Sequence, residues 1–150
     1  MGDFYVKPGD EVCFSKTVGE SDVYLFAGIT GDLSGNHVNE ELMRKSSYGR
    51  RIAHGALMVG FMSTASTMMI DFAGSTGGDE TAVSLGYDRI RFLAPVFIGD
   101  TITVTYRIAA VDAARRRSTS DISITNQQGE LVAVGNHILK WVANAAKAAE

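Results

Sequence analysis

An uncharged run of 16 residues, from Gly55 to Ile70, is the feature that most constrains the fold. Wound as a helix to about Phe72, it covers about 18 positions and is roughly 27 Å long. Its apolar side chains surround most of the helix, which predicts burial on nearly all sides. The run is shorter than the roughly 20 apolar residues that a bilayer core requires, and it contains Gly, Ser and Thr residues. We therefore expect the central helix of a soluble fold and no membrane partner.

The periodicity of the apolar residues changes after this helix. Residues 74–79, Gly-Ser-Thr-Gly-Gly-Asp, form a clear break. Beyond them apolar and polar residues alternate, which is typical of strands with one buried face; the apolar ones are Val83, Leu85, Tyr87, Ile102, Val104, Tyr106 and Ile108. Turns at 113–117 and 127–130 leave further strands near 117–126 and 130–142. The second half of the chain therefore predicts a mainly antiparallel meander.

The segment before the long helix carries shorter signals. Residues 11–18 alternate as a short strand does, and Ser21 is the expected N-cap of a helix that ends near Gly31. A polar loop, 32–37, follows this helix.

Asn39 can then cap a short helix over residues 40–43, and the Ala-rich residues 143–150 are expected to form a frayed tail. This order of elements predicts an α+β fold in which an antiparallel sheet packs on one helix. Such a sheet leaves an edge and a face uncovered, which favours a homodimer or a higher homo-oligomer.

The composition of the chain limits the classes of protein to which it can belong. The chain has 150 residues, 45% apolar and 21% charged, which is ordinary for one soluble domain over 1–150. Its net charge of −3 gives no indication of a nucleic-acid partner. One cysteine, Cys13, cannot form an internal disulfide, and no export signal opens the chain, so we expect a cytoplasmic protein.

A carboxylate and an imidazole lie five residues apart in the polar loop, at Asp32 and His37. A carboxylate can orient a water molecule, and a histidine titrates near neutral pH, so the two together could activate water and return its proton. On spacing alone, an Asp and a His in a glycine-containing turn are more often a helix cap and a surface residue than a catalytic pair.

A second group of candidates lies where the long helix begins. The first amides of a helix lack internal partners, so the Gly55 amide could bind an oxygen that becomes negative during a reaction. Ser63 lies about two turns further along the helix and could face the same cleft. The alternatives are structural: Gly55 as a helix start, His54 as a packed or capping residue, and Ser63 bonded to its own helix. His137, in the last predicted strand, is most simply a structural residue.

Other chemistries find no motif in the sequence. It contains no cysteine pair for zinc, no phosphate-binding glycine loop, and no serine in a nucleophile-elbow motif, so no metal site is predicted.

At these residues the sequence resembles the MaoC-like dehydratases, which include the (R)-specific enoyl-CoA hydratases of the hot-dog superfamily. The family's Asp and His, five positions apart, match Asp32 and His37, although Ser34 and Gly35 stand where Asn and Pro are usual. The family's apolar-apolar-His-Gly segment matches residues 52–55, and its helix serine matches Ser63. Its Phe, Pro-Val and Gly-Asp pattern matches Phe92, Pro95, Val96, Gly99 and Asp100. The resemblance covers about residues 8–142.

The resemblance implies a hot-dog fold that hydrates a trans-2-enoyl-CoA to an (R)-3-hydroxyacyl-CoA, or catalyses the reverse dehydration. Asp32 and His37 would hold the water, the Gly55 amide would polarise the thioester carbonyl, and Ser63 would line the site. It implies no cofactor, and it implies a dimer with an acyl-CoA substrate. Basic side chains could meet the phosphates of CoA; the candidates are Arg44, Lys45, Arg50, Arg51, Arg89 and Arg91.

Two other functions remain open at this point. A hot-dog thioesterase would hydrolyse the thioester, but its carboxylate usually lies on or next to the central helix, where the first acid here is Asp71 at the far end. A non-catalytic acyl-CoA-binding protein is the other alternative, since a fold does not fix a function.

Overall fold

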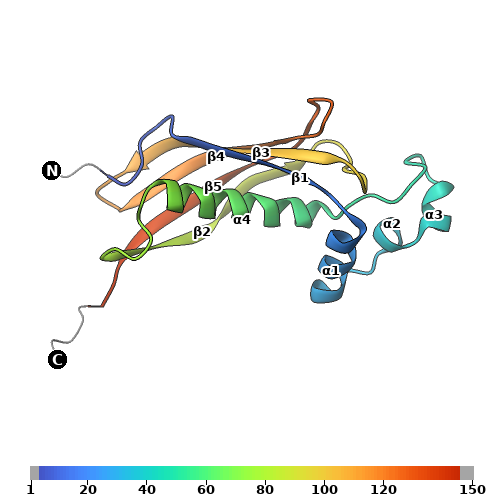
Figure 1. Ribbon diagram of the computed structural model, residues 1–150, viewed down its shortest axis with the longest axis horizontal. Helices are drawn as coiled ribbons and strands as arrows, with labels where there is room; N and C mark the ends of the chain where they lie inside the picture. Colours follow the sequence, from blue (N-terminus) through green and yellow to red (C-terminus); the bar gives the residue numbers. More distant parts are fainter. Residues whose placement is uncertain (1–3, 146–150) are drawn as a thin grey trace.

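A five-stranded antiparallel sheet packed on one long helix forms the body of the protein (Figure 1). The computed structural model describes residues 4–145. Within that range the sheet has the strand order β1-β3-β4-β5-β2. In chain order the elements are β1 (Glu11–Thr17), α1 (Glu20–Thr30), α2 (Gly35–Val38), α3 (Glu40–Arg44), α4 (Gly55–Phe72), β2 (Glu80–Phe92), β3 (Thr101–Asp112), β4 (Arg117–Thr125) and β5 (Leu131–Ala143).

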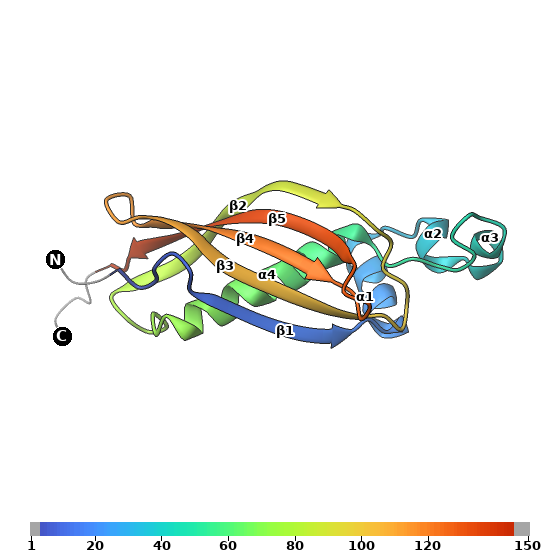
Figure 2. The ribbon, with the colours of Figure 1, turned by 90° about the horizontal axis from the view of Figure 1, so that it is seen from above.

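Three short helices lie together at one end of the molecule. Figure 2 shows the sheet lying across α4, while α1, α2 and α3 gather beyond the start of that helix. The segments that surround the N-terminus of α4 therefore come from the first third of the chain.

The long helix confirms the predicted limits, since α4 spans Gly55–Phe72. By length and composition alone it could cross a membrane, but its apolar face packs against the sheet as a core helix does. Burial on nearly all sides was wrong for this chain. One side is buried, and the opposite side is exposed because no second layer formed by residues 4–145 covers it. The buried residues are Leu57, Met58, Phe61, Met62, Ala65, Ser66 and Met69.

The sheet confirms the antiparallel prediction and adds detail to it. Strands β3, β4 and β5 form a meander, while β1 flanks β3 and β2 flanks β5. The predicted buried face of β3 is confirmed, because Ile102, Val104, Tyr106 and Ile108 are all buried.

The regular alternation predicted for β2 was wrong at one point. The register shifts between Ser84 and Gly86, so Leu85 is an extra residue of a β-bulge and is exposed. Tyr87 therefore packs against the core beside Ser84, rather than on one face with Leu85.

The start of α1 also differs from the prediction. The N-cap is Gly19, not Ser21, and the Asp22 carboxylate accepts the Gly19 N–H at 2.8 Å. An acidic side chain in the first turn thus replaces the hydroxyl cap.

The loop after α1 contains one element that the sequence did not predict, the single helical turn α2. The expected cap of α3 is confirmed, because the Leu42 N–H donates to Asn39 Oδ1 at 3.0 Å. Strand β5 continues to Ala143, and residues 146–150 of the predicted tail lie outside the described residues.

Candidate active site

The loop between α1 and α2 places Asp32 beside His37. Helix α1 ends at Gly31, whose φ of 78° lies in the left-handed region and turns the chain away from the helix axis. The Asp32 carboxylate follows at once, is exposed, and accepts the Ser34 N–H at 3.3 Å. His37 lies in α2 with a side chain that is 8% exposed. The two candidates are thus brought to one place, one in solvent and one nearly buried.

A backbone carbonyl orients the His37 ring. The distance between His37 Nδ1 and the Ile52 carbonyl oxygen is 2.8 Å. Because a carbonyl can only accept, Nδ1 carries the proton and donates it, and Nε2 of the neutral ring keeps a free lone pair. The Ile52 N–H in turn donates to the Asn36 carbonyl oxygen at 3.0 Å. Both backbone groups of Ile52 therefore bond to neighbouring residues of α2.

His54 lies against His37 and completes a small aromatic stack. The two rings are 3.7 Å apart between centroids and inclined by 27°, and Phe26 packs on His54 with a centroid distance of 4.7 Å. His54 is 1% exposed, and its Nε2 donates to the Asp32 carbonyl oxygen at 3.0 Å. Its side chain makes no cap bond to α4. The packed role is therefore the observed one, and it ties the Asp32 backbone to the start of α4.

Gly55 begins α4 and lines the same cavity as His37 and His54. The cavity has a volume of about 360 Å³. A Cβ at Gly55 would lie 2.6 Å from the Phe92 ring, so only glycine fits beneath that ring. The lining residues are Asn36, His37, Tyr48, Ile52, Ala53, His54, Gly55, Met58, Phe92, Leu93, Ala94, Pro95, Val96 and Val132. The cavity therefore has both polar and apolar walls.

The structure does not bring Ser63 to this cavity. This serine lies eight residues beyond Gly55, about 12 Å along the helix axis, and it is not among the residues that line the cavity. Ser63 is exposed, and its carbonyl oxygen accepts the Ser66 hydroxyl at 2.8 Å.

The polar cluster suits a bound water better than a metal ion. Asp32, His37 and His54 offer possible ligand atoms within 4.8 Å of one another. However, the two imidazole rings are stacked, so their in-plane lone pairs lie in nearly parallel planes instead of converging on one point. One nitrogen of each ring also donates to a backbone carbonyl. A tetrahedral site would require the rings to turn out of these contacts.

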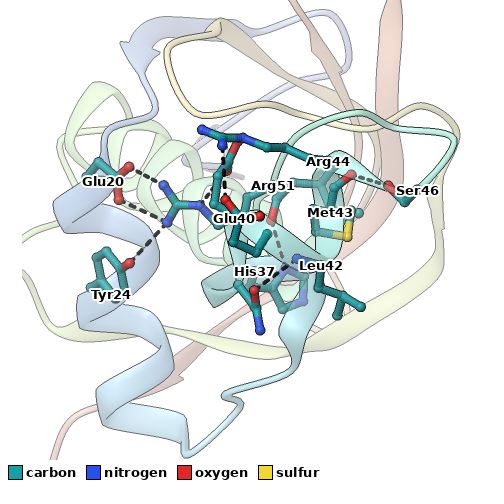
Figure 3. A network of polar contacts seen from close by, with 12 residues as sticks. Glu20, Tyr24, His37, Glu40, Leu42, Met43, Arg44, Ser46 and Arg51 are labelled. Carbon is teal, nitrogen blue, oxygen red and sulfur yellow. Dashed lines mark hydrogen bonds and ion pairs between the residues drawn. The ribbon is translucent and has the colours of Figure 1, made fainter.

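An ion-pair network lies behind the His37 loop (Figure 3). Arg51 contacts Glu20 and Tyr24 of α1, and its Nε donates to Glu40 of α3 at 3.0 Å. Hydrogen bonding to Glu20 is the main cause that raises the pKa of Arg51, and burial opposes it. Arg51 is therefore already engaged by carboxylates, which argues against its predicted contact with phosphate.

Of the other basic candidates, Arg44 is also paired, with Glu40 and Glu41. The Arg50 guanidinium lies over the Phe97 ring, 3.9 Å from its centroid.

His137 takes part in a separate network inside the core. Its Nδ1 lies 2.8 Å from the Tyr106 hydroxyl and its Nε2 lies 2.7 Å from the Ser84 hydroxyl. Tyr87 stacks on the ring with a centroid distance of 4.3 Å. These contacts support the structural role predicted for His137.

Several residues of the site gave no separate signal in the sequence. The Ile52 carbonyl is a backbone group, so no side-chain pattern could identify it. Arg51 pairs with a residue 31 positions away, and only the fold brings the two together. The position of His54 beside Gly55 was visible, but not its stacking on His37.

Comparisons with known proteins identify the family of this chain. The family model described as "MaoC like domain" matches residues 4–130. An (R)-specific enoyl-CoA hydratase of Rhodospirillum rubrum is 35% identical over 106 residues, which cover 71% of this chain and 68% of that protein. A 3-hydroxybutyryl-CoA dehydratase of Methylorubrum extorquens is 33% identical over 69% of this chain and 60% of that protein.

A solved structure extends the similarity to the whole fold. The (R)-hydratase of A. caviae superposes with a TM-score of 0.78 at 24% identity, and the match covers 90% of this chain and 96% of that one. The fold is therefore the hot-dog fold, as the sequence predicted. Because the family model matches most of this chain, residues 4–130, the chain belongs to the MaoC-like domain family.

Proposed function

We propose that the protein hydrates trans-2-enoyl-CoA to (R)-3-hydroxyacyl-CoA, or catalyses the reverse dehydration. The observation that carries the proposal is the free Nε2 of His37, which lines the cavity together with the start of α4. The Asp32 carboxylate lies next to this histidine, within 4.8 Å, although Asp32 is not among the residues that line the cavity. A general base, a second proton-bearing group and an amide that can bind an oxyanion are the three parts that hydration requires.

The chemistry starts from a water held between Asp32 and His37. The pair takes a proton from this water while its oxygen forms a bond to the β-carbon of the enoyl thioester. The electrons of the double bond move toward the thioester carbonyl, whose oxygen becomes negative and accepts the Gly55 N–H. The proton then returns from the pair to the α-carbon, so that the elements of one water are added.

The thioester itself supplies the activation that a cofactor would otherwise provide. Charge that develops at the α-carbon is delocalised into the carbonyl group, and the N-terminus of α4 favours negative charge at this position. We therefore propose that turnover requires no metal ion or prosthetic group. The apolar walls of the cavity, among them Met58 and Val132, suit the acyl chain.

The reaction on crotonyl-CoA tests this proposal against the two alternatives. We expect the enoyl absorbance to fall while no free thiol appears, and chiral analysis to show (R)-3-hydroxybutyryl-CoA. Thiol release in step with the loss of enoyl signal would indicate a thioesterase. Binding without any turnover would indicate an acyl-CoA-binding protein.

We also propose that two copies of the chain form a homodimer through the β2 edge of the sheet. β2 has β5 on one side and no strand on the other among the described residues. Three large apolar side chains near this edge are about half exposed, at Leu85, Phe92 and Leu93. Leu85→Lys should lower the sedimentation coefficient toward that of a monomer, and an unchanged coefficient would argue against this interface.

A further inference from the structure

Arg51 is the most extensively paired side chain near the candidate active site, although it does not line the cavity. Its side chain is 12% exposed, while those of its partners Glu20 and Glu40 are 53% and 39% exposed. One guanidinium therefore joins α1 to α3 from a nearly buried position, as Figure 3 shows. Such a planar group with several donors fixes its partners in a way that a lysine ammonium cannot.

The residue after Arg51 connects this ion-pair network to His37. Ile52 follows Arg51 directly, and its carbonyl oxygen accepts the proton of His37 Nδ1 at 2.8 Å. On its other side Ile52 forms an isolated antiparallel bridge with Phe97, and the Ala53 N–H donates to the Val96 carbonyl oxygen at 2.7 Å. Residues 51–53 are thus held between the helices and the 96–97 segment.

The position of this carbonyl decides which nitrogen of His37 can act on water. With Nδ1 donating to Ile52, Nε2 has the free lone pair that a general base requires. If the carbonyl moved away, both tautomers of the ring would become populated and the ring could rotate. A displacement of about 1 Å in a reacting group can cost roughly 100-fold in rate.

We infer that Arg51 is a positioning residue, which acts on the reaction through the Ile52 carbonyl and the tautomer of His37. It touches neither the substrate nor the reacting atoms. This inference rests on the proposed hydratase function for its kinetic part, but the tautomer of His37 can be measured without any substrate.

The chain offers a control in the turn between β3 and β4, and this turn lies at the end of the sheet away from α1, α2 and α3 (Figure 1). Arg116 makes a similar two-point contact with Glu80, in which its Nε donates to Oε1 at 3.0 Å. The control variant Arg116→Gln removes an ion pair that lies outside the cavity lining, and Arg116→Lys keeps the charge but not the planar fork, so the two report what such changes do to stability alone.

The experiment compares Arg51→Lys and Arg51→Gln with these controls. For Arg51→Gln we expect kcat on crotonyl-CoA to fall about 10- to 100-fold while KM changes less than about threefold. Arg51→Lys should lose less, because it keeps the charge but not the planar fork. The ¹⁵N NMR signals of His37 should show the Nδ1–H tautomer in the wild type and in the Arg116 variants, and a mixture of both tautomers in Arg51→Gln.

Normal kcat together with an unchanged His37 tautomer in folded Arg51→Gln would overturn the inference. If Arg51→Gln does not fold, Glu40→Ala removes only one of the acceptors of Arg51 and should shift the same two quantities in the same direction; unchanged values there would also overturn it. If the wild type shows no turnover, the hydratase function fails, while the NMR comparison still decides whether Arg51 positions His37.

Discussion

At the scale of single residues, His37 is oriented by a backbone carbonyl rather than by Asp32, the other residue of the candidate pair. Its Nδ1 donates to Ile52, and the Asp32 carboxylate accepts from the Ser34 N–H, so each group has its own support. The carboxylate is therefore available to a water molecule and to solvent. With Ser34 and Gly35 in place of the usual Asn and Pro, the loop still brings Asp32 next to His37.

Gly55→Ala tests whether the start of α4 needs a bare backbone. The new Cβ would lie 2.6 Å from the Phe92 ring, which must move across the cavity. We expect a loss of about 1 to 3 kcal/mol in the free energy of unfolding and a fall in kcat of at least about 10-fold. Chemical denaturation and steady-state kinetics on crotonyl-CoA measure the two effects, and unaltered kcat would show that the reaction does not need a bare backbone at residue 55.

At the scale of elements, α4 and β3 could be predicted because their patterns are local. The limits of α4 follow from an uncharged run, and the buried face of β3 follows from strict alternation. The bulge at Leu85 could not be located in this way, since a one-residue shift depends on the pairing with β5. Gly86 next to it was the only local indication.

The candidate site also has a part that the sequence could predict and a part that only the fold determines. A motif of two side chains identified Asp32 and His37, whereas the contacts that hold them involve backbone carbonyls and distant helices. Ser63 was assigned to the site by its place in the motif, but it lies about 12 Å along the helix from Gly55 and does not line the cavity.

Gly60→Ala is the control for Gly55→Ala within the same helix, and it also tests the exposed face of α4. No atom lies within 4 Å of a Cβ added at Gly60, and alanine is the better helix former. We expect the melting temperature to rise by about 1 to 4 °C, with kcat unchanged. A lower melting temperature would mean that another chain packs closely on this face.

At the scale of the whole molecule, the buried His137 makes stability depend on pH. Burial lowers its pKa from about 6.5 to about 4, so the folded protein resists a proton that the unfolded chain binds. The part of the free energy of unfolding that depends on a neutral His137 is fully present above pH 6.5 and is lost as the pH falls from 6.5 toward 4. It amounts to about 3 kcal/mol over that range.

His137→Gln should remove this dependence, because glutamine keeps a polar group beside Tyr106 and Ser84 but does not titrate. Urea unfolding at several pH values gives the free energy of unfolding for both proteins. Between pH 6 and pH 4.5 the wild type should lose about 1.4 kcal/mol per pH unit more than the variant. Parallel curves would show that His137 is not the group responsible.

The central claim, that Asp32 and His37 act together on one water, is tested most directly by kcat for crotonyl-CoA hydration in Asp32→Asn, His37→Ala and the double variant. We predict that each single substitution lowers kcat by about 10²- to 10⁴-fold in a protein that remains folded, and that the double variant loses little more, because residues that act as a unit are not additive. Wild-type kcat in both single variants would contradict the account.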